Sequence, residues 1–233
     1  MLINAVKITG GIEPETYKSL LKYFDSVEKE RISEKFNTGA SARFLLSAIL
    51  ARVTACVYLG VRNKDISFLE NSYGKPYLES FPAYGFNISH SGLWLVCGAC
   101  DDIIGIDIEA VRGVDFKVAK RFFCEEEYNE LMEKPEDERL NFFYDLWTLK
   151  ESYIKSLGKG LSIPLNSFRI NSDENGITLS GNEIEGVFAF KQYEVDIDYK
   201  LSVCVGKAIP DFPDTINIIE QNYLLEQFKI YAE

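Results

Sequence analysis

Two long segments of the chain repeat apolar residues every three or four positions. They are residues 42–60, "ARFLLSAILARVTACVYLG", and residues 142–158, "FFYDLWTLKESYIKSLG". This period predicts two amphipathic helices, each ending at a Leu-Gly pair. Elsewhere, short apolar runs bounded by turn signals such as "SDENG" and "SGNE" predict short strands. In the second helix, the period predicts a buried stripe of Phe142, Leu146, Leu149, Tyr153 and Leu157.

Similar segments recur about a hundred residues apart and in the same order. "LINAVKI" near the start resembles "IIGIDIE" at 103–109, the two helical segments correspond, and "LVCGA" at 95–99 resembles "SVCVG" at 202–206. The repeat predicts an α+β pseudo-dimer of two similar halves, residues 1–101 and 102–233. A C-terminal tail containing "TINIIEQNYLLEQF" is expected to be helical and to pack across. We expect the active site at the interface between the halves, because such interfaces favour ligand binding.

The composition fits a folded protein with a sizeable core, since 46% of its 233 residues are apolar. The 36 acidic and 25 basic residues give a formal net charge of −11, which argues against nucleic-acid binding because that requires a basic surface. The N-terminus lacks the pattern of a signal peptide, and we expect no apolar stretch that approaches the length of a membrane span. Together with five sparse cysteines, these features predict a cytoplasmic protein with no membrane partner.

Two of the cysteines, Cys97 and Cys100, form a Cys-x-x-Cys motif inside a strand-like run. A redox-active motif of this kind is expected at the start of a helix, where the thiolate is stabilised. In a strand, residues three apart point to opposite faces. We therefore expect both cysteines to be buried core residues.

The segment "IGIDIE" ends in two carboxylates that share one face of a predicted strand. Strand alternation points Ile104, Ile106 and Ile108 toward a core, whereas Gly105, Asp107 and Glu109 point the other way. Two carboxylates on one face repel each other unless a cation lies between them, and Mg²⁺ suits such oxygen ligands. An ordinary solvent-exposed strand face is the alternative that this segment leaves open.

The second predicted helix carries Trp147, Glu151 and Lys155 in a row at i, i+4 and i+8. A Glu–Lys pair at this spacing is commonly a surface pair that stabilises the helix. The tryptophan indicates instead that this face is partly covered. Glu151 could then complete a three-carboxylate site for Mg²⁺, and Lys155 could meet a phosphate.

Two further short motifs could bind phosphate. "NISHSG" brings Ser89 and the only histidine, His90, next to a glycine. A serine hydrolase is less well supported because no Gly-x-Ser-x-Gly segment is present, and a single histidine makes zinc catalysis a poor fit. "YGKPYL" adds Lys75, a candidate contact for a phosphate or a base edge and otherwise an exposed turn lysine.

Five motifs, "YGKPYL", "FNISHSG", "IGIDIE", "RFF" followed by Glu, and "LWTLKESYIKSLGKGL", occur here in the order and spacing of one known family. From about residue 26 to 210 the chain resembles the surfactin-type 4′-phosphopantetheinyl transferases of the holo-carrier-protein synthase superfamily. The resemblance implies a pseudo-dimer that binds coenzyme A between its halves. It also implies Mg²⁺-dependent transfer of 4′-phosphopantetheine from coenzyme A to a serine of an apo carrier protein, with release of 3′,5′-ADP.

The resemblance also implies a role for each motif residue. Asp107, Glu109 and Glu151 would hold Mg²⁺, Lys155 would stabilise charge on the pyrophosphate, and Glu151 would act as the base for the carrier serine. The implied coenzyme A contacts are Lys75, Ser89, His90, Lys155 and Arg43. The motif "RFFCEEE" departs from the family, because Cys124 replaces the usual Ser or Thr of a capping box. We expect Cys124 to cap poorly and Glu127 to be structural rather than catalytic.

Two other functions remain open. One is a metal-dependent phosphoesterase acting on nucleotides or coenzyme A, which leaves the paired halves unexplained. The other is a non-catalytic module that binds coenzyme A or a carrier protein, which has no need of a complete acid triad. For the transferase, we expect an acidic carrier domain as partner, and the candidate docking residues are Lys117, Lys120, Arg121, Lys155 and Lys159. Docking on the neighbouring apolar "FF" and "LS" residues, with the basic residues serving only solubility, is the alternative. We also expect a monomer, because the interface that builds the site is internal to the chain.

Overall fold

The computed structural model describes residues 1–36, 41–174, 176–181, 184–207 and 210–233, and it contains two antiparallel sheets that are built alike. In the N-terminal half, the strands lie in the order β1-β5-β4, and in the C-terminal half in the order β6-β10-β9. The strands are β1 (Leu2–Lys7), β4 (Gly85–Ser91), β5 (Trp94–Cys100), β6 (Ile104–Ala110), β9 (Ala189–Tyr193) and β10 (Tyr199–Val205). Among these three strands of each half, the one that comes last in the chain (β5 or β10) therefore lies between the other two.

One long helix covers each sheet, and a short hairpin follows each helix along the chain. α3 (Ser41–Leu59) and the hairpin β2–β3 (Phe68–Glu70, Pro76–Leu78) belong to the N-terminal half, and α6 (Glu136–Leu157) and β7–β8 (Arg169–Asp173, Gly176–Ser180) to the C-terminal half. This shared order confirms the predicted α+β pseudo-dimer. The smaller elements are α1 (Pro14–Leu21), α2 (Ser26–Phe36), η1 (Asn63–Asp65), α4 (Lys117–Phe122), α5 (Glu125–Glu133), η2 (Gly160–Ser162) and η3 (Leu165–Ser167).

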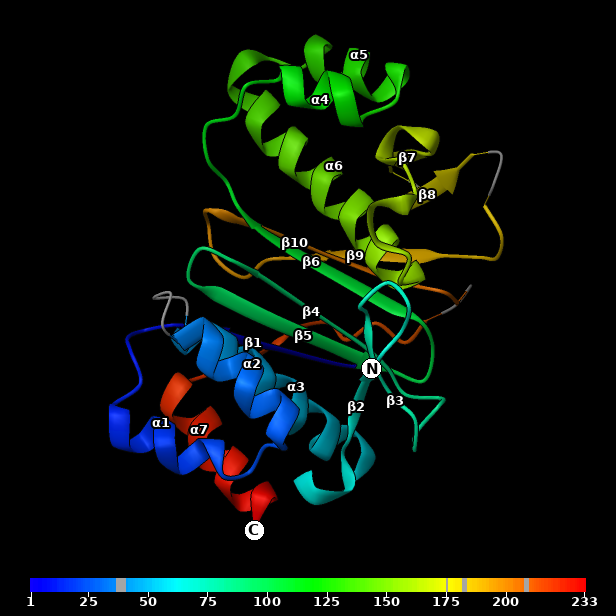
Figure 1. Cartoon of the computed structure of the whole chain (residues 1–233). Helices are drawn as coiled ribbons and strands as arrows, with labels where there is room; N and C mark the ends of the chain where they lie inside the picture. Colours follow the sequence, from blue (N-terminus) through cyan, green and yellow to red (C-terminus); the bar gives the residue numbers. More distant parts are fainter. Residues whose placement is uncertain (37–40, 175, 182–183, 208–209) are drawn as a thin grey trace.

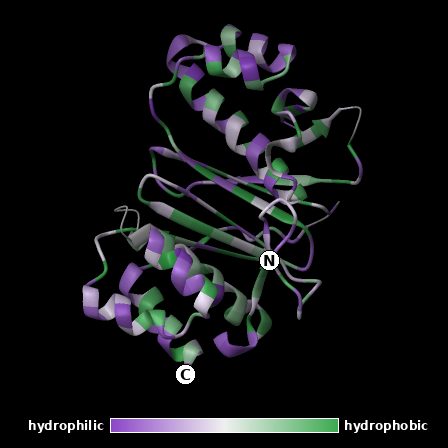
Figure 2. Cartoon of the chain, in the orientation of Figure 1, coloured by the Kyte–Doolittle hydropathy of each residue, from purple (hydrophilic) through white to green (hydrophobic). Residues whose placement is uncertain are grey.

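The halves stack in four layers, with helices outside and the two sheets inside (Figure 1). One apolar cluster lies between the sheets, and one lies between each sheet and its helices. Hydrophobic colouring runs along the central strands, while the outer helices alternate between hydrophobic and hydrophilic (Figure 2). The central cluster contains Ile104, Ile106 and Ile108, as strand alternation predicted. Cys97 and Cys100 are likewise buried, on opposite faces of β5 in different clusters.

The C-terminal tail returns to the N-terminal half (Figure 1). β11 (Asn217–Ile219) pairs in parallel with β1, and α7 (Gln221–Ala232) packs against α3. Leu224 and Phe228 of α7 are fully buried in the cluster beneath the first sheet. The last strand and helix of the chain thus complete the core of the first half.

α3 corrects one expectation from the sequence. The window Ala42–Leu59 is long and apolar enough to cross a membrane by length and composition alone, although we expected no such stretch. In the structure, 56% of this window is buried, and α3 contacts β5 and α7. The helix also carries Arg52, whose guanidinium is paired with the Glu28 carboxylate of α2. Its apolar character is accounted for by this position in the core of the protein.

The two sheets meet along a seam between their edge strands, β4 and β6. Side-chain oxygens at every second position of β4 accept hydrogen bonds from backbone N–H groups at every second position of β6. The pairs are Asn87 Oδ1 with Ile106 N (2.9 Å), Ser89 Oγ with Ile108 N (3.3 Å) and Ser91 Oγ with Ala110 N (3.1 Å). Polar side chains of one half thereby satisfy the edge of the other half's sheet.

Gly105 lets β6 approach the backbone of α6. A Cβ at this position would lie 1.9 Å from the carbonyl oxygen of Ser152 and 2.4 Å from the amide nitrogen of Ser156. Both atoms belong to the backbone of a packed helix and cannot turn aside. The close approach therefore requires glycine, and it places the following β6 residues directly against α6.

We predict that Gly105→Ala lowers the free energy of unfolding by about 2–3 kcal/mol, because the added methyl group forces α6 away from β6. Urea unfolding followed by circular dichroism measures the change. Gly113→Ala is the matched control, since a Cβ there would have nothing within 4 Å. Equal unfolding midpoints for the two variants would contradict this account.

Candidate active site

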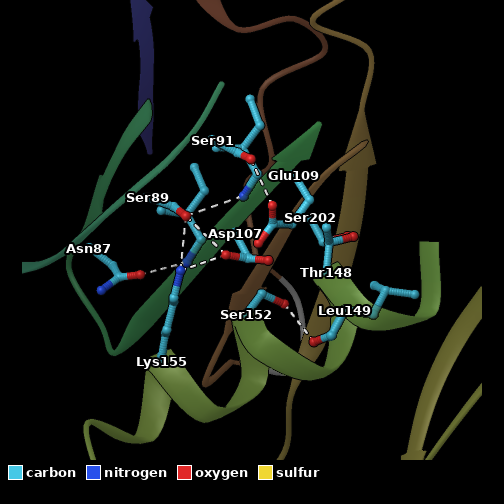
Figure 3. Close-up of polar contacts among 12 residues, drawn as sticks. Asn87, Ser89, Ser91, Asp107, Glu109, Thr148, Leu149, Ser152, Lys155 and Ser202 are labelled. Atoms are coloured by element: carbon cyan, nitrogen blue, oxygen red, sulfur yellow. Dashed lines mark hydrogen bonds and ion pairs between the residues drawn. The ribbon is translucent and has the colours of Figure 1, made fainter. Parts of the chain in front are cut away.

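β6 and α6 bring three carboxylates and one lysine to the same interface. Asp107 and Glu109 lie on the face of β6 that also holds Gly105, and α6 supplies Glu151 and Lys155 one turn apart (Figure 3 shows the strand residues and Lys155). Asp107 is only 2% exposed, whereas Glu109, Glu151 and Lys155 are half-buried. The polar row on α6 thus faces the interface, as the sequence indicated.

The seam serines also orient the carboxylates of β6. Asp107 Oδ1 accepts hydrogen bonds from Ser89 Oγ (2.9 Å) and from Lys155 Nζ (2.5 Å), and Lys155 Nζ also donates to Ser89 Oγ (2.9 Å). Ser91 Oγ donates to Glu109 Oε2 (2.7 Å). Each serine accepts a bond from the β6 backbone and donates one to a carboxylate on the same strand (Figure 3). Sequence analysis identified Ser89 but not the parallel role of Ser91, whose only signal is the alternation of polar residues along β4.

The three carboxyl groups form one electrostatically coupled cluster. Burial is the largest cause that raises the pKa of Asp107, Glu109 and Glu151 above the ordinary values. The charge of Asp107 raises the pKa of both Glu109 and Glu151 further, whereas Lys155 lowers the pKa of all three. Lys155 is thus the cation that all three carboxyl groups share, while Arg112 also lowers the pKa of Glu109, and the cluster has an excess of negative charge.

These residues fit a hard divalent cation such as Mg²⁺. Asp107 Oδ2 is buried and has no hydrogen-bond partner among the described residues, so one carboxylate oxygen at the centre of the cluster is unsatisfied. Carboxylate oxygens are the ligands that Mg²⁺ prefers, and a divalent charge would offset the excess negative charge. Asp107, Glu109 and Glu151 are the residues that would hold it.

The described residues do not yet surround a metal position. Within the part of the chain that the structure describes, no three His, Cys, Asp or Glu side chains converge to hold an ion. Instead, the Lys155 ammonium is paired with Asp107. The Lys155 ammonium therefore neutralises part of the negative charge that a metal cation would otherwise neutralise. Metal binding by Asp107, Glu109 and Glu151 stays a prediction.

The predicted coenzyme A contacts fall into three places. Ser89 and Lys155 lie beside Asp107. His90 is exposed and points away from the carboxylates, because it follows Ser89 along a strand. Burial and the neighbouring charge of Arg43 lower the pKa of His90, and Arg43 itself donates to the carbonyl oxygen of Gly92 (2.9 Å). Ser89 and Lys155 thus form one group and His90 and Arg43 a second, on the other side of β4.

An apolar pocket of about 260 Å³ lies between α2, α3 and β4. Phe86 and Ile88, on the same face of β4 as His90, form part of its wall, and Arg31 and Glu70 form an ion pair among its lining residues. No sequence pattern had indicated this pocket. Its remaining lining residues are Glu28, Ile32, Phe44, Ser47, Ala48, Ala51, Phe68 and Pro76.

Lys75 occupies the third place, apart from both groups. Its ammonium donates to the backbone carbonyl oxygens of Ile104 (3.1 Å), Lys155 (2.6 Å) and Ser156 (3.0 Å). The structure therefore brings Lys75 to the backbone of β6 and α6, and not to the carboxylates or to the apolar pocket.

Glu127 forms a buried ion pair with Lys150, the residue before Glu151. Glu127 is 1% exposed and Lys150 is fully buried, with Nζ–Oε distances of 2.6 and 2.7 Å. Glu127 also accepts hydrogen bonds from the backbone N–H groups of Cys124 (2.9 Å) and Ile170 (2.8 Å), and Lys150 donates to the carbonyl oxygen of Phe168 (2.7 Å). These contacts account for Glu127 as a residue that joins α5, α6 and β7. Lys150 belongs to the quoted motif "LWTLKESYIKSLGKGL", but no role was predicted for it.

Two family models match adjoining parts of the chain. The model described as the 4′-phosphopantetheinyl transferase superfamily matches residues 103–204, and the model described as 4′-phosphopantetheinyl transferase, N-terminal, matches residues 13–102. Together they cover most of both halves and adjoin between β5 and β6, where the first half passes into the second.

Curated relatives match nearly the whole chain. The 4′-phosphopantetheinyl transferase Sfp of Bacillus subtilis strain 168 is 35% identical over 226 residues, 97% of this chain and 100% of the relative. Another 4′-phosphopantetheinyl transferase of Bacillus subtilis is 40% identical over 202 residues, 86% of this chain and 89% of the relative. A solved holo-(acyl-carrier-protein) synthase from Bacillus anthracis, in complex with CoA (3′,5′-ADP), is 20% identical and covers 44% of this chain and 92% of its own, with a TM-score of 0.38. That score is too low to support an inference about this chain.

We predict that Glu127→Gln lowers the free energy of unfolding by about 3 kcal/mol, because it leaves the buried Lys150 ammonium without a charged partner. The double variant with Lys150→Met should regain about 1–2 kcal/mol of that loss, since it removes the unpaired charge. Urea unfolding of the single and double variants forms the test. A purely additive loss in the double variant would contradict the predicted coupling.

Proposed function

The chain belongs to the 4′-phosphopantetheinyl transferase superfamily, and we propose that the carboxylate cluster between β6 and α6 is where it performs the transfer. It is a 4′-phosphopantetheinyl transferase, which moves the phosphopantetheinyl group from coenzyme A to a serine of an apo carrier protein. The observation that supports this site most directly is the buried Oδ2 of Asp107, which no described residue hydrogen-bonds, in a cluster that carries excess negative charge. Such a cluster suits a cation-assisted reaction of a diphosphate.

The reaction replaces one phosphorus–oxygen bond with another. The serine hydroxyl oxygen of the carrier attacks the phosphorus that bears the pantetheine arm, and the bond from that phosphorus to the oxygen shared with 3′,5′-ADP breaks. The products are the phosphopantetheinylated serine and 3′,5′-ADP. Transfer of this kind depends mainly on positioning and on neutralisation of the phosphate charge.

Each residue of the cluster has a proposed part in this reaction. A divalent cation held by Asp107, Glu109 and Glu151 would supply charge neutralisation at the diphosphate. The Lys155 ammonium would donate to a phosphate oxygen. The Ser89 hydroxyl would do the same only by turning its proton away from Asp107 Oδ1. The Glu151 carboxylate, or a water that it orients, would take the proton of the carrier serine.

The nucleotide end of coenzyme A is proposed to lie on the other side of β4. The apolar pocket offers Phe44, Phe68 and Phe86 as surfaces for a planar base. Arg43 and His90, which lie close together beside this face of β4, could donate to a phosphate on the ribose. Ser89 and His90 alternate along the strand, so a single extended ligand could meet both sides of β4.

The partner, oligomeric state and compartment are also proposals. A carrier protein would dock near the exposed residues Lys117, Lys120 and Arg121 of α4 and Lys159 after α6, which offer positive charge to an acidic partner. A monomer is supported by the interface between the halves, which lies within one chain. A reducing compartment, the cytoplasm, is supported by the five cysteines, all of which are free.

We predict that an apo carrier domain incubated with the protein, coenzyme A and Mg²⁺ gains the mass of one phosphopantetheinyl group, with equimolar release of 3′,5′-ADP. Mass spectrometry of the carrier and chromatography of the nucleotide measure both products. A reaction in EDTA is the control. Loss of coenzyme A without a gain in carrier mass would instead support the phosphoesterase, and no change in either would support a binding module.

We further predict that Glu151→Gln removes most turnover, about a hundredfold or more, while the dissociation constant for coenzyme A changes less than about threefold. Gln keeps the size of the side chain but removes the negative charge and the proton acceptor. Steady-state kinetics and isothermal titration measure the two effects. Glu133→Gln on the exposed surface of α5 is the matched control. Unchanged turnover in Glu151→Gln would defeat the proposed role.

A further inference from the structure

A lysine of the N-terminal half caps the C-terminal end of α6, the helix that carries Glu151 and Lys155. We propose that Lys75 is a positioning residue, which holds β6 and α6 together at the end next to the carboxylate cluster and so fixes where the acidic side chains lie. This inference rests on the proposed function of the cluster. It differs from the expectation that Lys75 clamps the nucleotide, because the structure directs its ammonium to protein carbonyls.

The turn between β2 and β3 holds the backbone of Lys75 in a defined orientation. Asn71 Oδ1 accepts hydrogen bonds from the backbone N–H groups of Tyr73 and Lys75 (both 2.9 Å), and Asn71 N donates to the carbonyl oxygen of Lys75 (3.0 Å). Gly74 has a φ of +82°, a conformation that glycine adopts at little cost. The base of the Lys75 side chain is therefore held by its own turn.

The Lys75 ammonium caps the last turn of α6. The last four carbonyl groups of a helix have no partner within the helix, and they form its negative end. Lys75 Nζ bonds two of these groups, those of Lys155 and Ser156, and Asn71 Nδ2 bonds the carbonyl oxygen of Gly158 (3.0 Å). A side chain from the first half thus satisfies the end of the main helix of the second half.

The same ammonium also bonds β6. Its third acceptor is the carbonyl oxygen of Ile104, three residues before Asp107. Lys75 therefore joins the strand that carries two of the acidic residues to the helix that carries the third. Near this junction Gly105 already brings the two backbones into contact. A shift of α6 along β6 would therefore have to break bonds to Lys75.

The side chain of Lys75 has little freedom to leave this place. Its stem lies over Gly158, where an added Cβ would come within 2.7 Å of Lys75 Cδ. Burial lowers the pKa of Lys75 to about 8, which reflects an ammonium removed from water. Among the described residues, its hydrogen bonds go to backbone carbonyls alone. To meet a ligand phosphate, the ammonium would have to give up those three bonds.

The test compares Lys75→Met with the exposed control Lys64→Met on the same half. Methionine keeps most of the length and packing of the stem but removes the ammonium. The first readout is hydrogen exchange of peptides covering residues 151–158, without metal or coenzyme A. We expect these amides to exchange about tenfold faster in Lys75→Met, because the helix end loses its cap. The second readout is the affinity of the protein for Mn²⁺ alone, which we expect to fall about tenfold.

Coenzyme A affinity separates the two roles of Lys75. If Lys75 acts through position, the dissociation constant for coenzyme A in EDTA should stay within about twofold of the wild-type value, while kcat falls with the Mn²⁺ affinity. Weaker coenzyme A binding with unchanged exchange and unchanged Mn²⁺ affinity would overturn the proposal in favour of a ligand contact. Three unchanged readouts would overturn it in favour of an ordinary turn lysine.

A second variant keeps the inference testable if Lys75→Met does not fold. Asn71→Asp retains the acceptor for the turn amides but loses the donor to the Gly158 carbonyl. We expect the same changes at smaller size, and unaltered exchange of residues 151–158 would again contradict the proposal. A wild-type protein that binds no Mn²⁺ would instead count against the proposed metal site, because the hydrogen-exchange result does not depend on metal.

Discussion

The seam between β4 and β6 is the contact on which both the fold and the site depend. Two edge strands meet there, and their backbones are joined through side chains rather than through a ladder of backbone hydrogen bonds. A serine that accepts a bond from a backbone N–H still has a proton to donate. Ser89 and Ser91 donate theirs to Asp107 and Glu109, so the contact that joins the halves also aims the carboxylates. The cluster therefore takes its arrangement from the docked halves together.

Two buried acids of this protein differ in how well they are satisfied. Glu127 has Lys150 and two backbone N–H groups as partners, and its local charge is balanced. Asp107 shares Lys155 with two other carboxyl groups, and its Oδ2 has no hydrogen-bond partner within the described part of the chain. A satisfied buried pair is explained by the packing of α5, α6 and β7 alone. An unsatisfied cluster has an energetic cost that packing does not explain, and functional sites are where such costs are tolerated.

Features with a strict sequence period could be predicted, and contacts that depend on the docked halves could not. Alternation placed Ile104, Ile106 and Ile108 on one face of β6, and the internal repeat predicted two halves whose sheets have the same strand order. The stripe on α6 was only partly right, because Phe143 and Ile154 are buried while Phe142 and Leu157 are partly exposed. This helix packs against the sheet and against α5 at once, so its buried surface is wider than one stripe and includes Lys150, Ser152 and Ser156. The sequence predicted that Lys75 contacts a ligand. No local pattern could reveal that its hydrogen-bond acceptors are backbone carbonyls more than 25 residues away.

The difference between the two similar halves also explains why, among the described residues, such a cluster lies on β6 and not on β1. β1 and β6 correspond within the three strands that the halves share, although β11 also pairs with β1, and each lies beneath the long helix of its half. On its helix-facing side β6 carries Gly105, Asp107 and Glu109, whereas β1 carries Asn4, which bonds Thr54 of α3 (2.9 Å), and the fully buried Val6. The first half thus uses this position for its core, and it contributes Ser89, Ser91 and Lys75 to the site of the second half. The first half needs no charged side chains on the helix-facing side of β1, and its other residues support the carboxylates of the second half. The described residues therefore form an asymmetric site at a nearly symmetric interface.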